Sequence, residues 1–155
     1  MAEPRAAGER NGTDSDRALR IVIGENNTDL ATTVALLLDS ESDMHCCATV
    51  SSASAVLGVL EQHAPNAFVL DLSLDDGPSL PLIATLRARQ PQAVIIVFTG
   101  YQNPVLTEQC LRAGADEVVV KSGDIDNLIE ALRRAAGHNP PGTGRAAAAI
   151  ASPPP

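Results

Sequence analysis

Val94-Ile95-Ile96-Val97-Phe98-Thr99 is a continuous apolar run that ends on a hydroxyl side chain. A run of this kind is typical of a strand that is buried on both faces. Such strands occur in parallel sheets, because the helices that connect parallel strands cover both sides of the sheet. We therefore expect residues 93–98 to form one strand of a parallel sheet.

Short apolar runs alternate with amphipathic segments five times along the chain. The other predicted strands are residues 21–23, 44–50, 66–71 and 117–120. Each strand precedes a segment with helical spacing of apolar residues or a helix-start signal. The apolar positions of these helices are Leu30, Val34, Leu37 and Leu38; Val56, Leu57 and Leu60; Leu82, Ile83 and Leu86; and Ile125, Leu128, Ile129 and Leu132. The predicted helix caps are Asn27 or Thr28, Asn103 before Pro104, and Asp124, with Gly114 and Gly137 at helix ends.

This alternation predicts an α/β, doubly wound (βα)5 domain with a five-stranded parallel sheet. A common strand order for such a domain is 2-1-3-4-5, with ligands bound beyond the carboxyl ends of the strands. In that order strands 1, 3, 4 and 5 are consecutive neighbours. Side chains that follow these four strands are therefore expected on one rim of the sheet.

The composition limits the function classes. The chain has 155 residues and a net charge of −8, which would repel the phosphate backbone of a nucleic acid. No apolar stretch approaches the ~20 residues of a membrane span, so we expect a cytoplasmic protein with neither nucleic-acid nor membrane partners. The three cysteines are predicted to be buried, reduced thiols.

Both ends of the chain differ in composition from its centre. Residues 1–18 are polar, charged and interrupted by Gly and Pro, which predicts a flexible N-terminal arm. Residues 138–155 are rich in Pro, Gly and Ala, which predicts a disordered tail. The folded domain is then expected over residues 19–137.

Four chemically active side chains follow the four neighbouring strands. They are Glu25, Asp71, Thr99 and Lys121, the last being the only lysine of the chain. Neighbouring strands lie about 4.8 Å apart, so Asp71 and Lys121 would start roughly 10 Å apart, within reach of a lysine stem. Two carboxylates, a hydroxyl and an ammonium are therefore predicted to converge.

This group of side chains favours phosphoryl transfer. Two neighbouring carboxylates suit Mg²⁺, which takes one or two carboxylates together with water and phosphate oxygens. Asp71 would be the nucleophile, while Thr99 and Lys121 would support the phosphoryl group. Taken singly, Asp71 could be an ordinary cap, Thr99 a strand end and Lys121 a surface residue. A glycine-rich phosphate loop is disfavoured, because Gly24 has no later glycine at the required spacing.

These segments resemble the receiver domain of bacterial two-component response regulators, a flavodoxin-like fold, over residues 19 to about 136. The resemblance lies in residues 69–77 around Asp71, residues 97–100 around Thr99 and residues 111–121 before Lys121. It implies a phosphoacceptor signalling domain, at most catalysing its own phosphorylation and dephosphorylation, not an enzyme with a separate substrate. Ser122 follows Lys121, and in this respect the chain is similar to the branch of the family that usually carries a helix-turn-helix output domain. Without such a domain in this sequence, we expect a single-domain regulator.

The resemblance also implies roles for individual residues. Asp71 would accept a phosphoryl group from a sensor histidine kinase or a phosphotransfer protein. Mg²⁺ would be held by Asp71, Glu25 and the backbone carbonyl of Ser73. Ser73 and Tyr101 occupy positions that tune dephosphorylation in this family. The face made by helix 4, strand 5 and helix 5 would contact a downstream protein or a second copy, and would carry Glu108, Arg112, Glu117, Arg133 and Arg134.

Two positions depart from the family pattern. Gly24 stands where the first of two acids is usual, and a register shift by one residue would leave the same deficit. Val118 stands where an aromatic switch residue is usual, three positions before Lys121. They keep open a phosphorylation-independent pseudo-receiver that acts as a protein interaction module. An enzyme or a flavin-binding domain on the same fold is a third alternative.

Overall fold

A computed structural model describes residues 18–100, 103–122 and 124–137. Except for Ala18, the predicted arm lies outside these residues, and so do the predicted tail and Tyr101. The domain boundaries and the role of Tyr101 therefore stay predictions. The helices that these residues form lack the combination of length and apolar character that crossing a bilayer requires.

Five parallel strands form the central sheet, in the order β2-β1-β3-β6-β7. Their bounds are β1 Leu19–Gly24, β2 Met44–Val50, β3 Ala67–Leu70, β6 Val94–Thr99 and β7 Glu117–Val120. This is the predicted order 2-1-3-4-5, with β6 and β7 as the fourth and fifth strands, so the predicted fold is confirmed. The sequence pattern did not indicate two further short strands, β4 Ser73–Leu74 and β5 Gly77–Pro78, which form a separate antiparallel hairpin.

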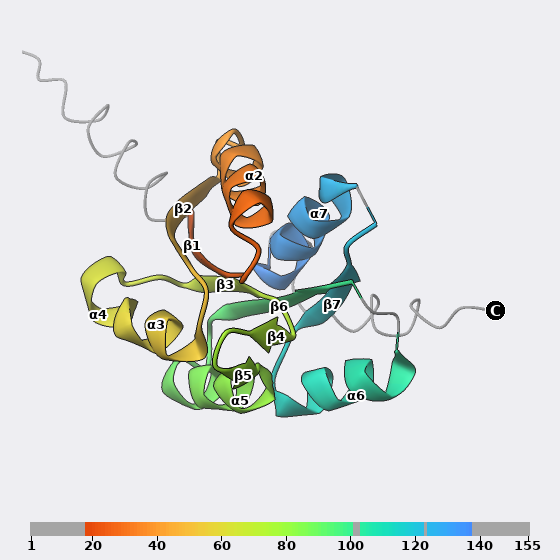
Figure 1. The fold of residues 1–155 in the computed structure, drawn as a ribbon. Helices are drawn as coiled ribbons and strands as arrows, with labels where there is room; N and C mark the ends of the chain where they lie inside the picture. The colour runs from red at the N-terminus through yellow and green to blue at the C-terminus, as the bar shows by residue number, and fades with distance from the viewer. Residues whose placement is uncertain (1–17, 101–102, 123, 138–155) are drawn as a thin grey trace, which may run out of the picture.

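Helices cover both faces of the sheet (Figure 1). On one face lie α2 Thr28–Asp39 and α7 Ile125–Ala135. On the other lie α3 Ala53–Gly58, α4 Leu60–His63, α5 Leu80–Arg89 and α6 Pro104–Ala113. Successive side chains of a strand point to opposite faces, so Ile96 packs with the α2 and α7 layer, whereas Ile95 packs with the other. All six residues of β6 are buried, as the apolar run predicts.

Two details of the predicted helices were wrong. The predicted core face of α2 included Leu37, but Leu37 is 40% exposed; the helix buries the predicted Val34 and Leu38, together with Ala31. Leu37 precedes Leu38 by one residue, or about 100° around the helix, which places it at the margin of the apolar stripe. The second predicted helix is split into α3 and α4 around Val59.

The predicted caps are confirmed. The side chains of Asn27, Asn103 and Asp124 accept backbone hydrogen bonds at the starts of α2, α6 and α7. Gly114 follows α6 with a φ of 127°, a conformation that side chains disfavour. It also lies against the stem of Arg87, whose Nε donates to the Gly114 carbonyl at 2.9 Å. Gly114 therefore serves both the helix end and the contact between α5 and α6.

We expect Gly114→Ala to destabilise the domain by about 1–3 kcal/mol, because the new side chain is strained at positive φ. Its Cβ would lie 2.7 Å from the Cβ of Arg87. Urea unfolding measures the effect. Gly58→Ala is the matched control, since a Cβ there meets nothing within 4 Å. That control should be neutral or stabilising by up to about 1 kcal/mol. Equal stability of the two variants would contradict the predicted strain.

Candidate functional site

The carboxyl ends of four strands meet on one rim of the sheet. The register pairs Gly24 with Leu70, Leu70 with Val97, and Thr99 with Val120. The residues that follow β1, β3 and β7 are Glu25, Asp71 and Lys121, and the structure brings these three side chains together. Thr99 ends β6 on the same rim, is 1% exposed, and accepts the backbone N–H of Lys121 at 2.6 Å through its carbonyl.

Lys121 bridges the two carboxylates. Its Nζ lies 2.7 Å from Oε1 of Glu25 and 3.1 Å from Oδ2 of Asp71. The side chains are 20% exposed for Lys121, 6% for Glu25 and 14% for Asp71. The ammonium also lies 5.8 Å from the centre of the Phe98 ring. The single lysine of the chain is therefore a partly buried component of this site.

The second oxygen of each carboxylate is held by the backbone. Oε2 of Glu25 accepts the N–H of Asn27 at 3.0 Å, which ties the carboxylate to the start of α2. Oδ1 of Asp71 accepts the N–H of Leu72 at 2.7 Å. The hydroxyl of Ser79 donates to the backbone carbonyl of Asp71. Both acids are thereby oriented before any ligand arrives.

The protonation of Lys121 follows from its surroundings. Burial lowers the pKa of its ammonium, but the hydrogen bonds to Glu25 and Asp71, together with the two negative charges, outweigh burial. The pKa of Lys121 is therefore raised above its usual value. The lysine is charged at neutral pH and offsets two carboxylates with one positive charge.

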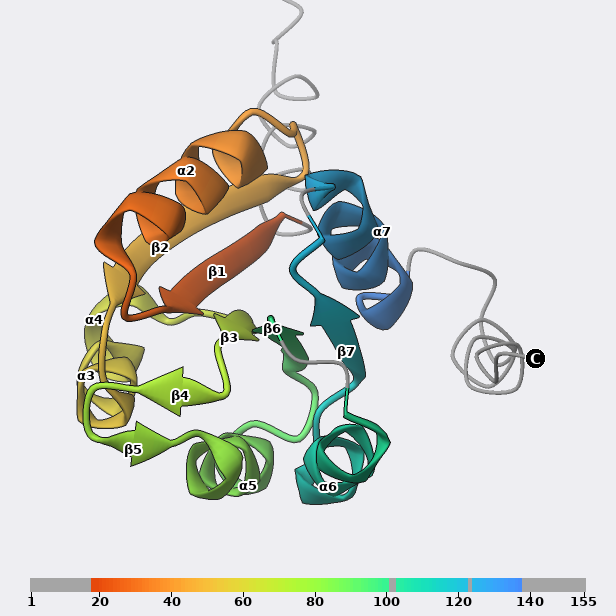
Figure 2. The same cartoon turned by 45° about the vertical axis from the view of Figure 1, so that its right-hand side comes forward.

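A hairpin follows Asp71 and carries Ser73 (Figure 2). The N–H of Ser79 donates to the carbonyl of Leu72 at 2.9 Å, so these two residues form a hydrogen-bonded pair. Antiparallel pairs alternate, and the next pair, Ser73 with Pro78, is then not hydrogen-bonded. Pro78 has no N–H to donate in any case. The hairpin ladder therefore leaves the Ser73 carbonyl available for another partner.

The donor set fits a magnesium ion. Within the described ranges, no group of three or more His, Cys, Asp or Glu side chains is arranged to hold a metal ion. Mg²⁺ does not require such a cage, because it takes one or two carboxylates together with waters and substrate oxygens. Glu25 and Asp71 both contact one ammonium, so a cation in its place would lie beside both carboxylates.

Sequence reasoning missed Ser79 and Asp76. Ser79 is 0% exposed and binds the Asp71 backbone, while Asp76 accepts the N–H groups of Ala53 and Ser54 at the start of α3. The run Asp75-Asp76-Gly77 after Leu74 is a turn signal that the sequence did contain. Residues distant from the rim thus hold the loop that follows Asp71.

The cysteines take no part in this site. All three are free; Cys110 is buried, whereas Cys46 and Cys47 are only half-buried. The prediction of reduced thiols is confirmed, and that of full burial is wrong for the last two. Burial is the largest cause that raises the pKa of all three, to about 11 for Cys46. These thiols are poor nucleophiles, because the thiolate is the reactive form.

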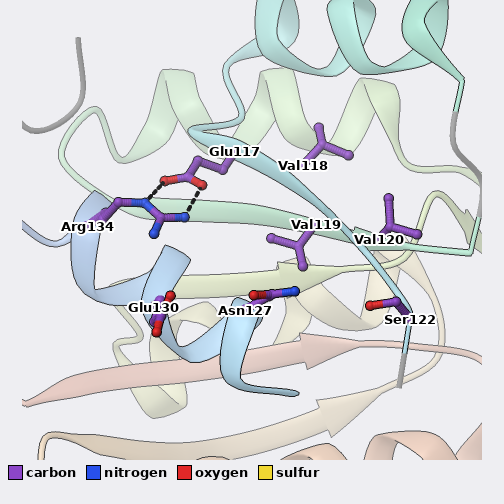
Figure 3. A pocket seen from close by; sticks show the side chains of 8 residues that line it. All are labelled: Glu117, Val118, Val119, Val120, Ser122, Asn127, Glu130 and Arg134. Atoms are coloured by element: carbon purple, nitrogen blue, oxygen red, sulfur yellow. Dashed lines mark hydrogen bonds and ion pairs between the residues drawn. The ribbon is translucent and has the colours of Figure 1, made fainter. Parts of the chain in front are cut away.

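A hollow of about 370 Å³ lies between β7 and α7 (Figure 3) and extends to Val120 and Ser122, on either side of Lys121 in the chain. It is lined by Glu117, Val118, Val119, Val120, Ser122, Asn127, Glu130 and Arg134. Arg134 binds Glu117 through two bonds, of 3.0 and 2.7 Å. Arg133, expected on the same face, instead binds Glu41 and Asp43 between α2 and β2. We call this hollow the β7–α7 groove.

The family model of the response regulator receiver domain matches residues 21–133. The photosynthetic apparatus regulatory protein RegA of Rhodobacter capsulatus is 30% identical over 118 residues, or 76% of this chain and 62% of RegA. The oxygen regulatory protein NreC of Staphylococcus haemolyticus is 27% identical over 117 residues, or 74% of this chain and 54% of NreC. The chain thus spans less than two thirds of these relatives, and the single-domain expectation stays a prediction.

Solved structures share the fold. A DNA-binding response regulator of the LuxR family from Staphylococcus aureus has a TM-score of 0.70 at 20% identity, covering 76% of this chain and 98% of that one. The response regulator domain of CheB from Thermotoga maritima also has a TM-score of 0.70, at 15% identity, covering 80% of this chain and 100% of that one. At these identities the likeness shows the flavodoxin-like fold alone.

Proposed function

The chain belongs to the response regulator receiver family of two-component signalling domains, and from that premise we propose that Asp71 is its phosphoacceptor. The observation that carries the proposal is the bridge from Lys121 to Asp71 and Glu25 on the rim. Members of this family are signalling domains, not classical enzymes. The donor would be a phosphohistidine of a sensor kinase or of a phosphotransfer protein.

In the proposed step a carboxylate oxygen of Asp71 attacks the phosphorus of the phosphohistidine. The new O–P bond forms as the N–P bond breaks, and the electron pair of that bond stays on the imidazole nitrogen. Asp71 is 14% exposed at the rim, so a donor can reach it. The ammonium of Lys121 and the hydroxyl of Thr99 would bind the phosphoryl oxygens, since phosphoryl transfer depends on positioning and charge neutralisation.

We further propose that Glu25, Asp71 and the Ser73 carbonyl hold Mg²⁺. When bound, the ion would neutralise charge on the transferring group. The hairpin geometry supports the choice of Ser73, because its carbonyl lies outside the β4–β5 ladder. Intact mass after incubation with Mg²⁺ and a small phosphodonor tests the proposed function directly. A gain in mass that requires Asp71 supports it.

A phosphorylation-independent interaction module remains the second candidate. It is favoured by Gly24, where a Cβ would lie 3.0 Å from Cδ2 of Leu70, so no second acid fits beside Glu25 without movement. Such a module would keep its partner binding in Asp71→Ala. Membership of the receiver family disfavours the third alternative, an enzyme or flavin-binding domain. The cytoplasmic location stays a prediction.

We propose that phosphorylation is read out by protein contacts at the face of α6, β7 and α7, where the β7–α7 groove lies. The observation behind this choice is that β7 pairs only with β6 within the described residues, so its outer edge is open to a partner. The partner would be a second copy or a downstream protein. Val118 has no aromatic ring that could change its rotamer on phosphorylation. We therefore propose that the signal is a change in charged pairs on this face, such as that of Arg134 with Glu117.

We expect beryllofluoride, a phosphate analogue, to shift the sedimentation coefficient of the wild type toward a dimer or a complex with its target. Arg134→Ala should weaken this association about fivefold, because in the proposed readout the arginine pairs with a carboxylate of the partner, and a partly exposed ion pair contributes about 1 kcal/mol. Arg89→Ala removes an exposed arginine of α5 and should have no effect. No shift in the wild type, or equal effects of the two variants, would count against this face.

A further inference from the structure

Gly24 lies at the carboxyl end of β1 among apolar side chains from three other elements. A Cβ at this position would lie 3.0 Å from Leu70 Cδ2, 3.3 Å from Val56 Cγ2 and 3.7 Å from Leu74 Cδ1. The three side chains belong to β3, α3 and β4, and are 0, 0 and 5% exposed. We call Gly24, Val56, Leu70 and Leu74 the apolar seat. The space of a side chain at position 24 is therefore filled by carbon.

Leu74 is the residue that the hairpin places in this seat. It is the second residue of β4, three positions after Asp71 and next to Ser73. The tip of the same hairpin is fixed to the segment that leads into α3 and to the first residues of that helix. The N–H of Asp75 donates to the Ser51 carbonyl at 2.9 Å, and the Asp76 carboxylate accepts from Ala53 and Ser54 at 2.8 and 3.1 Å.

The other end of the hairpin is fixed to Asp71 itself. Ser79 donates its N–H to the Leu72 carbonyl and its hydroxyl to the Asp71 carbonyl. The polar contacts therefore hold the tip and the base, whereas the side chain of Leu74 holds the middle against β1. Apolar burial of a leucine contributes about 1.5–3 kcal/mol, comparable with one or two hydrogen bonds.

We infer that the apolar seat positions the Ser73 carbonyl and the Asp71 carboxylate, and that Gly24 and Leu74 are positioning residues for the rim. This inference rests on the proposed function, because it assigns these two groups to the bound cation. Gly24 is then a packing requirement of the hairpin. A larger residue there presses on Leu70, which immediately precedes Asp71, and on Val56, so it acts on metal binding through the seat even when it adds no charge.

Leu74→Ala tests the inference, with Leu82→Ala as its matched control. Both leucines belong to the same core cluster and are 5 and 4% exposed, but Leu82 lies on α5. We expect Leu74→Ala to weaken Mg²⁺ binding about tenfold, as loss of a residue that orients a ligand does. Leu82→Ala should lower the unfolding free energy without changing the Mg²⁺ dissociation constant. Isothermal calorimetry and urea unfolding give the two quantities.

Gly24→Ala provides a second variant in case Leu74→Ala does not fold. It should weaken Mg²⁺ binding in the same direction, although it removes no ligand and no charge. In metal-free wild type, the amides of Asp75 and Ser79 should exchange slowly, and both variants should speed their exchange without affecting β6. Equal Mg²⁺ dissociation constants in the wild type and in both seat variants would overturn the inference.

Failure of the proposed metal site is distinguishable from failure of the inference. If the wild type binds no Mg²⁺, the metal proposal fails. Hydrogen exchange alone then tests whether the apolar seat positions the hairpin. Faster exchange confined to the hairpin amides in Leu74→Ala then still supports positioning of the loop. Exchange that rises equally across the domain, as in Leu82→Ala, means that Leu74 is an ordinary core residue and overturns the inference.

Discussion

Asp71→Asn should abolish phosphorylation of this domain, while the wild type gains one phosphoryl group of roughly 80 Da. The amide keeps the size of the side chain and its place on the rim, but it lacks the anionic oxygen that attacks phosphorus. The gain should require Mg²⁺ and be lost on mild hydrolysis, as expected of an acyl phosphate. Intact mass after incubation with a small phosphodonor, with and without Mg²⁺, measures it.

Asp75→Asn is the matched control, because Asp75 lies in the same hairpin and contributes only its backbone N–H to a defined contact. It should gain the same mass as the wild type. A gain that persists in Asp71→Asn would assign the phosphate to another residue. No gain in the wild type, repeated with a sensor kinase as donor, would favour the phosphorylation-independent module.

The sheet could be predicted from the sequence because a strand that is buried on both faces is a continuous apolar run. The run of residues 94–98 in β6 is apolar without interruption, and the helix that follows β6 begins at the capping residue Asn103. The strand order then determined which strand ends are neighbours. The convergence of Glu25, Asp71 and Lys121 followed from that order, since the three residues lie just past three of four consecutive strands, with β6 between β3 and β7.

The hairpin after Asp71 could not be predicted in the same way. Two-residue strands are too short to show an apolar period, and the contacts that fix them join residues far apart in sequence, such as Asp76 and Ala53. Gly24 is a related case. In the sequence, Gly24 indicated only that an acid usual in the receiver family is missing. The structure shows that Leu70 and Val56 fill the space that a side chain at position 24 would need.

Lys121→Met should destabilise the metal-free domain by about 3 kcal/mol at pH 7. It leaves Glu25 and Asp71, 6 and 14% exposed, facing each other without a cation. Breaking a fully buried pair costs about 3–5 kcal/mol, and the 20% exposure of Lys121 favours the lower end. Urea unfolding in the presence of a chelator measures the loss. Arg112→Met removes an exposed ion pair and should change stability by less than about 0.5 kcal/mol.

The pH dependence of this difference has a defined sign. The pKa of Lys121 is raised in the folded state above its ordinary value of 10.5, so its stabilisation is complete below that value. The advantage of the wild type over Lys121→Met should then persist through neutral pH and fall only as the pH rises above 10.5 and through the folded-state pKa. A difference that disappears below pH 9 would contradict the charged bridge.

Lys121→Met should also bind Mg²⁺ more tightly than the wild type, although it loses a residue of the site. The ammonium and the metal ion need the same two carboxylates, so removing one competitor favours the other. Added Mg²⁺ should therefore restore more stability to the variant than it adds to the wild type. An unchanged Mg²⁺ dissociation constant would mean that the ion binds elsewhere, and that Glu25 and Asp71 serve the lysine alone.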